Sequence, residues 1–256
     1  MSGASVNERM RARARSAALR FRSRFRQSLE NPEVPLSLDM RRPSRTLLVA
    51  FGGMQGLIGM PPFEFFKASG EIPVKRLFVR DLRQAWYHRG IPGHGADLDG
   101  VVAALGELLG EYDVERLVMV GNSAGGYAAL LFGSLLGADV VLAFAPQTVI
   151  DLQTLAGMDD HRWDEQLQEL ADSGDLDERF SDLQAALPAA RRGRTRYELY
   201  YDETFDIDRR HAERIAAVEG VELHGIDGGR HGVAREMRET GELDRVLQRA
   251  LLPDGS

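Results

Sequence analysis

Apolar and polar positions alternate along the chain in blocks that predict strands and helices in turn. Short apolar runs predict strands at 46–51, 75–80, 116–120, 139–145, 195–202 and 221–227. Segments with apolar residues on one face predict helices at 61–69, 97–112, 208–218 and 233–252, and one more helix directly after Ser123. Because strands that alternate with crossover helices form mostly parallel sheets, we expect an α/β fold of about six strands with helices on both faces.

Residues 151–190 interrupt this alternation after the fourth predicted strand. They are acidic and contain helical pieces, with Phe180 and Leu183 on one apolar face, but no strand pattern. We therefore expect a short helical insertion within a domain that spans residues 44–256.

The first 43 residues differ from the rest in charge. Up to Glu30 the chain has eight arginines and two glutamates, a net charge of +6, whereas the whole chain carries −7 and the remainder therefore −13. We predict that residues 1–43 form a basic arm and a proline-broken linker, mobile or docked on the acidic body. A basic amphipathic helix that contacts an anionic lipid surface or a partner is the alternative.

Composition narrows the classes of function. No apolar run approaches the roughly 20 residues of a membrane-spanning helix, so we expect no stable membrane insertion. The acidic net charge does not favour nucleic acid as a partner. The absence of cysteine excludes disulfides and thiolate sites and fits a reducing compartment, so we predict a cytoplasmic protein.

The sequence also gives no sign of a cofactor or a metal. The stretch FGGMQGLIG follows the first predicted strand, where a dinucleotide-binding loop would lie, but it does not match the Gly-x-Gly-x-x-Gly pattern. No group of histidines and carboxylates has the spacing of metal ligands. We expect neither group to be bound.

The stretch RLVMVGNSAGGYAALLFG contains the clearest candidate for chemistry. A predicted strand breaks at a glycine-rich turn and resumes as a helix, with Ser123 at the tip between Gly121 and Gly125. Such a turn is too tight for side chains at these two positions, and it exposes the serine hydroxyl at the N-terminus of the next helix. The pattern predicts a nucleophile, and the alternative is an ordinary serine that caps a helix.

A nucleophilic serine needs a base and an acid. His231 is the histidine that lies just beyond the last predicted strand. The acid, which orients the imidazole, should follow the fifth predicted strand, where Asp202, Glu203, Asp206 and Asp208 lie. We select Asp208, although it could instead cap the following helix, and Asp206 is the alternative.

Two further groups of residues could complete the site. Acyl transfer needs two backbone N–H groups beside the developing oxyanion, and we assign these to Ala124 and to Gly53 or Met54. The stretch RDLRQAWYHRGIPG follows the second predicted strand, so that its Trp86 could line the substrate pocket with the next two residues, Tyr87 and His88, or pack beneath the loop.

These motifs resemble the α/β-hydrolase superfamily. The order Ser123, Asp208, His231, the GNSAGG turn and the Gly-Gly loop after the first strand match that family over about residues 45–252. The resemblance implies the α/β-hydrolase fold, places 151–190 where the family has its cap, and implies a serine hydrolase that acts on a small-molecule acyl ester through an acyl-enzyme.

The chain departs from the family in three places. The loop after the first strand reads FGG instead of the more usual His-Gly, and the family's two N-terminal strands are not evident unless VPLSL at 34–38 supplies a remnant. The loop that holds the predicted acid lacks the common Gly-x-x-Asp pattern. These departures leave the subfamily and the choice of acid open. An acyltransferase or thioesterase on the same fold, or a non-catalytic accessory protein, are the alternatives.

Overall fold

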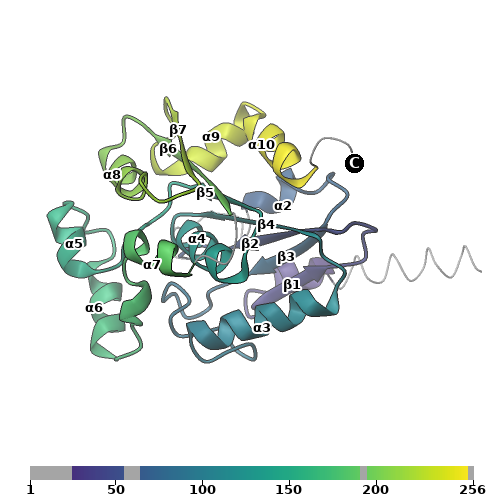
Figure 1. Cartoon of the computed structure of the whole chain (residues 1–256), viewed down its shortest axis with the longest axis horizontal. Coiled ribbons are helices and arrows are strands. Elements are labelled where there is room, and N and C mark those ends of the chain that lie inside the picture. The colour runs from purple at the N-terminus through teal and green to yellow at the C-terminus, as the bar shows by residue number, and fades with distance from the viewer. Residues whose placement is uncertain (1–24, 55–63, 191–194, 253–256) are drawn as a thin grey trace, which may run out of the picture.

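The computed structural model describes residues 25–54, 64–190 and 195–252 and has a central sheet with helices on both faces (Figure 1). The strand order is β1-β3-β2-β4-β5-β6-β7, in which β1 is antiparallel to β3 and the other neighbours are parallel. The strands are β1 (Leu36–Asp39), β2 (Thr46–Phe51), β3 (Lys75–Val79), β4 (Arg116–Asn122), β5 (Val140–Phe144), β6 (Arg196–Asp202) and β7 (Val221–Ile226). The six predicted strands are all present, with ends that differ by at most two residues.

The central strands are continuous apolar runs because both of their faces are covered. In β2, Leu47 and Val49 pack into the layer that includes α3 (Leu98–Glu111), α4 (Ala124–Leu136) and the inserted segment. The alternate residue Leu48 packs into the opposite layer, with α2 (Glu64–Ala68), α9 (Val233–Glu239) and α10 (Glu242–Leu251). The sheet is therefore the middle of three layers.

The seventh strand corrects the expected count of about six. β1 comes from the 34–38 stretch and pairs with β3, with Leu36 opposite Val79. It is short and lies at the edge of the sheet, which is why its pattern is weak.

Part of the predicted arm and linker also belongs to the folded body. Residues 25–30 are helical, and Phe25 and Leu29 are buried in the layer with α2 and α10. The buried Arg80 guanidinium donates to the carbonyls of Asn31 and Val34 at 2.9 and 2.6 Å. The structure thus places residues 25–43 against the domain, while residues 1–24 of the predicted arm lie outside the described residues.

The predicted helical insertion lies between β5 and β6. It contains α5 (Leu152–Gly157), α6 (Asp164–Asp172), the 3-10 turn η1 (Glu178–Phe180) and α7 (Leu183–Ala190), which we call the cap. Figure 1 shows α5 and α6 at one side of the molecule and α7 beside α4. The predicted terminal helix is in fact two helices, α9 and α10, because Gly241 adopts a left-handed φ of 74° between them. Within the described ranges, no helix is long and apolar enough to cross a membrane.

Candidate active site

Ser123 lies at the sharp turn between β4 and α4. Its φ of 56° and ψ of −121° lie outside the regions that most side-chain-bearing residues adopt. A Cβ on Gly121 would lie 2.0 Å from the Gly125 carbonyl oxygen, and one on Gly125 would lie 2.4 Å from the carbonyl oxygen of Phe51. Both contacts are impossible, so steric exclusion explains the two-residue spacing of the glycines.

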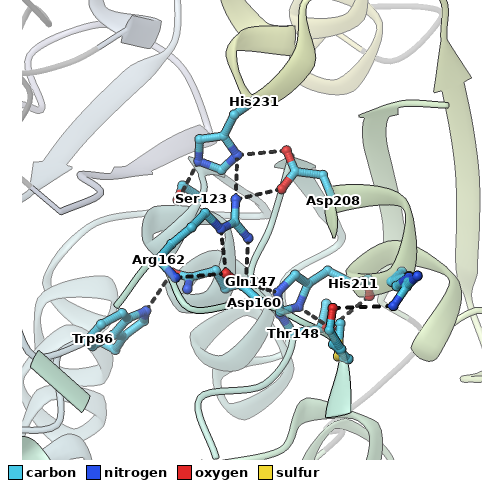
Figure 2. A network of polar contacts seen from close by, with 11 residues as sticks. Trp86, Ser123, Gln147, Thr148, Asp160, Arg162, Asp208, His211 and His231 are labelled. Atoms are coloured by element: carbon cyan, nitrogen blue, oxygen red, sulfur yellow. Dashed lines mark hydrogen bonds and ion pairs between the residues drawn. The ribbon is translucent and has the colours of Figure 1, made fainter. Parts of the chain in front are cut away.

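The structure brings Ser123, His231 and Asp208 together. The Ser123 hydroxyl lies 3.0 Å from His231 Nε2, and His231 Nδ1 lies 2.7 Å from Asp208 Oδ2 (Figure 2). Because a carboxylate only accepts hydrogen bonds, the Nδ1 proton is donated to Asp208, which leaves Nε2 free to accept from the serine. Asp208 is fully buried, whereas a third of the His231 side chain faces solvent.

The helix α8 (Asp206–Arg214) decides which of the acidic residues reaches His231. It begins at Asp206, so that Asp208 lies in its first turn and is not the N-cap that the sequence allowed. The alternative acid, Asp206, points elsewhere and forms ion pairs with Arg209 and Arg210 on the exposed side of the helix. Of these two residues, only Asp208 contacts the imidazole.

Asp202, another of the four acidic residues, holds the histidine loop. It is buried at the end of β6 and accepts hydrogen bonds from the backbone N–H of Arg230 at 2.7 Å and of Thr204 at 2.8 Å. His231 follows Arg230 directly in the 3-10 turn η2 (Arg230–Gly232). Asp202 therefore attaches the loop that presents His231 to the edge of the sheet.

Sequence reasoning missed a cap residue, Arg162, that contacts the acid. Its Nη1 donates to Asp208 Oδ1 at 2.9 Å and lies 3.3 Å from His231 Nδ1 (Figure 2). Its Nε and Nη2 donate to the two oxygens of the buried Asp160 at 2.8 and 2.7 Å. Arg162 follows Asp160 by two residues in a polar stretch of the cap, so that nothing in the local pattern separated it from the other surface arginines.

A buried histidine, His211, contacts the same Asp160 that Arg162 contacts. His211, three residues after Asp208 on α8, has Nε2 2.9 Å from Asp160 Oδ2, and its Nδ1 accepts from the Thr148 backbone N–H at 3.1 Å. The proton therefore lies on Nε2. Burial lowers the pKa of His211, so the ring is neutral and donates a hydrogen bond without adding charge. Burial acts to raise the pKa of Asp160, but hydrogen bonds from His211 and Arg162 hold it well below its ordinary value.

The loop after β2 lies against the serine turn. A Cβ on Gly53 would be 3.1 Å from the Asn122 carbonyl oxygen and 3.7 Å from the Gly125 nitrogen. Neither the Gly53 amide nor the Ala124 amide donates to a backbone carbonyl of the described residues. Both predicted oxyanion donors are thus near Ser123, and Met54, the alternative to Gly53, packs partly buried against the core.

The three residues considered as pocket lining are buried in the protein. Trp86 Nε1 donates to Gln147 Oε1 at 2.8 Å, and the Tyr87 hydroxyl donates to the Gly52 carbonyl at 2.9 Å. His88 is buried between α4 and the cap, and burial lowers its pKa to about 4. These side chains therefore pack beneath the loop, which was the alternative to lining the substrate pocket.

Comparisons with known proteins show which solved structures share this fold. No protein-family model matches the chain, and no curated protein matches it in sequence. A chain of the Glycosylation Associate Protein (Gap123) complex from Streptococcus agalactiae aligns with 86% of this chain, at a TM-score of 0.61 and 20% identity. This chain spans only 44% of the length of that one.

Two other solved structures align over most of both chains. The capsule O-acetyltransferase of Neisseria meningitidis serogroup A has a TM-score of 0.59 at 13% identity and is covered over 90% of its length, with 83% of this chain aligned. The fluorophosphonate-binding serine hydrolase F of Staphylococcus aureus has a TM-score of 0.55 at 12% identity, with 83% of this chain and 86% of that chain covered. At such identities the likeness shows a shared fold, and the chemistry depends on the residues of this chain.

Proposed function

We propose that this chain, which has the α/β-hydrolase fold, is a serine hydrolase that cleaves an acyl ester. The observation that carries the proposal is the hydrogen-bonded series in which Ser123, His231 and Asp208 are joined at 3.0 and 2.7 Å. The positive φ of Ser123 supports it, because strained backbone at a polar residue is typical of functional sites.

In the proposed mechanism the Ser123 hydroxyl attacks the carbonyl carbon of the ester while His231 Nε2 takes up its proton. Asp208 stabilises the imidazolium that forms and holds the ring in one tautomer. The backbone amides of Ala124 and Gly53 stabilise the negative charge on the carbonyl oxygen. His231 then protonates the leaving alcohol, and an acyl-enzyme remains on Ser123.

The second half of the reaction decides between two activities. Attack by water on the acyl-enzyme makes the protein an esterase, and attack by an acceptor alcohol makes it an acyltransferase. The second is a candidate because one protein of the same fold is described as a capsule O-acetyltransferase. The cap is short and acidic, which favours a small or polar acyl group over a long chain.

Labelling of the purified protein with a fluorophosphonate probe tests the proposal. We expect a covalent adduct on the peptide that contains Ser123, and no adduct in Ser123→Ala or in heat-unfolded protein. Hydrolysis of p-nitrophenyl acetate should fall about 10⁶-fold in Ser123→Ala, whereas the melting temperature should stay close to that of the wild type. Wild-type protein that is folded but does not label would favour a non-catalytic accessory role.

A matched pair of assays separates the two activities. p-Nitrophenyl acetate is offered with and without a high concentration of an acceptor sugar, and the products are analysed by mass spectrometry. An esterase yields acetate in both cases, whereas an acyltransferase yields the acetylated sugar. A marked preference for p-nitrophenyl palmitate over the acetate would contradict a small acyl group. A cytoplasmic location and the absence of a nucleic-acid partner stay predictions.

A further inference from the structure

The charge balance around Asp208 depends on one cap residue. Asp208 and Asp160 are both buried, with side-chain exposures of 0% and 2%. The Arg162 guanidinium contacts both carboxylates, with Nη1 on Asp208 and Nε and Nη2 on Asp160. Two buried carboxylates need a compensating cation, because an isolated charge in a protein interior is strongly destabilising.

Among the described residues, the other charged groups around Asp208 do not supply this cation. His211 contacts Asp160 from α8, but its pKa is lowered by burial and it is neutral. On the outer side of α8, Arg209 is paired with Asp206 and Glu213, and Arg210 with Asp206. His231 itself contacts Asp208, but it must be neutral to act as a base.

The geometry also shows how Arg162 orients the acid. It occupies Oδ1 of Asp208 at 2.9 Å, which leaves Oδ2 to accept from His231 Nδ1 at 2.7 Å. Each carboxylate oxygen therefore has its own partner, and the plane of the carboxylate is held from two sides. The two partners come from segments far apart in sequence, the cap and the loop after β7 (Figure 2).

We propose that Arg162 is the positioning residue of this site, and that its contact with Asp208 makes the docking of the cap on α8 part of the catalytic arrangement. The inference rests on the proposed function, because it assigns Arg162 a role through Asp208 and His231. Arg162 acts on the acid and on the side of the imidazole opposite to Ser123, so it does not touch the reacting atoms.

The proposal predicts a change in pH dependence with a definite sign. Burial acts to raise the pKa of Asp160, and hydrogen bonds from His211 and Arg162 hold that pKa low. Without Arg162, Asp160 and Asp208 lose the cation that contacts both of them, so the pKa of Asp160 rises. A proton bound by this pair of carboxylates disturbs the acceptor of His231 Nδ1, so the acid side of the activity profile moves to higher pH.

The test uses Arg162→Gln and Arg162→Lys, with Arg89→Gln as the matched control. Arg89 also links the body to the cap, through Glu169 and Asp175, but the structure gives it no contact with Asp208 or His231. The rate of fluorophosphonate labelling and of p-nitrophenyl acetate hydrolysis is measured from pH 5 to 9. The Nδ1–H resonance of His231, which reports its hydrogen bond to Asp208, is followed by NMR in the same proteins, so that one readout does not depend on activity.

We expect Arg162→Gln to lower kcat on the order of 100-fold at neutral pH, with KM little changed, and to move the acid limb of the activity profile to higher pH. The His231 Nδ1–H resonance should also shift, because its hydrogen bond to Asp208 loses the support of the guanidinium. Arg162→Lys should restore part of kcat and part of the position of the acid limb, because lysine keeps the charge but loses the forked contact. Arg89→Gln should lower the melting temperature slightly and leave the acid limb in place.

Two outcomes would separate the inference from the proposed function. If the wild type labels at Ser123 but Arg162→Gln only lowers the melting temperature, as Arg89→Gln does, the positioning role is wrong and the hydrolase proposal stands. If the folded wild type does not label, the hydrolase proposal fails, and an unchanged His231 Nδ1–H resonance in Arg162→Gln would then overturn the inference as well.

Discussion

The β4–α4 turn and the cap both contribute to one site, but different forces build them. The turn is held by contacts between neighbouring backbone segments, where a single added Cβ at Gly121 would come within 2.0 Å of a carbonyl oxygen. The cap reaches the site through ion pairs between residues far apart in sequence, such as Arg162 and Asp208. The turn is therefore defined by short-range sterics and is readable from a pattern, whereas the cap contact depends on charge and burial.

Among the predictions that test this comparison, the largest effect is expected for one of two acids on the same helix. Asp208→Asn should reduce kcat by about 10⁴-fold, because the amide no longer selects the imidazole tautomer that accepts from Ser123. Asp206→Asn, on the exposed side of α8, should stay within a few-fold of the wild type. Ester hydrolysis at neutral pH measures both. A strong loss of activity in Asp206→Asn with a mild loss in Asp208→Asn would show that the assignment of the acid to Asp208 is wrong.

The next effect tests the steric origin of the turn with two glycines. In Gly121→Ala the new methyl group meets the backbone of Gly125, so the turn must move, and we expect unfolding free energy to fall by roughly 3 kcal/mol with loss of fluorophosphonate labelling. Gly110→Ala is the control, because a Cβ there meets nothing and the residue lies within the helix α3. It should stabilise the protein by roughly 0.5–1 kcal/mol. Urea unfolding measures both, and equal effects would contradict the steric explanation.

The third prediction concerns how the cap is held on α4 through His88. Its Nδ1 accepts from the backbone N–H of Asp177, and its Nε2 donates to the Tyr127 hydroxyl, which itself donates to the Phe180 carbonyl. The ring is therefore neutral, in agreement with the pKa of about 4 that burial produces. The folded state binds fewer protons than the unfolded state between pH 6.5 and 4. This contribution to stability is complete above pH 6.5 and is lost as the pH falls, by about 3 kcal/mol in total.

Urea unfolding at pH 7, 5.5 and 4.5 measures this loss. His88→Gln, whose amide offers one acceptor and one donor but binds no proton in this pH range, should lose less stability on acidification than the wild type. His161→Gln is the control, because that side chain is more than half exposed and its pKa is raised by Asp164. The control should lose as much unfolding free energy on acidification as the wild type does. If the unfolding free energy depends on pH in the same way in all three proteins, His88 does not link the packing of the cap on α4 to pH.

The sequence by itself determined the order of strands and helices, the insertion and the serine turn. These features depend on short-range rules: a buried parallel strand must be apolar throughout, and a tight turn around Ser123 excludes side chains at Gly121 and Gly125. His231 also follows from its place after the last strand. The edge strand β1 was only a remnant in the pattern, because a short strand at the edge needs few apolar residues.

Only the tertiary structure decided which acid faces His231 and what holds that acid. Asp206 and Asp208 lie in one turn of α8 and have the same chemistry, so their roles differ only in which way the helix faces the sheet. Arg162 resembles the other arginines of the chain until folding buries Asp160 and Asp208 around it. A charge becomes decisive when water is removed from its surroundings, and that depends on every segment that covers it.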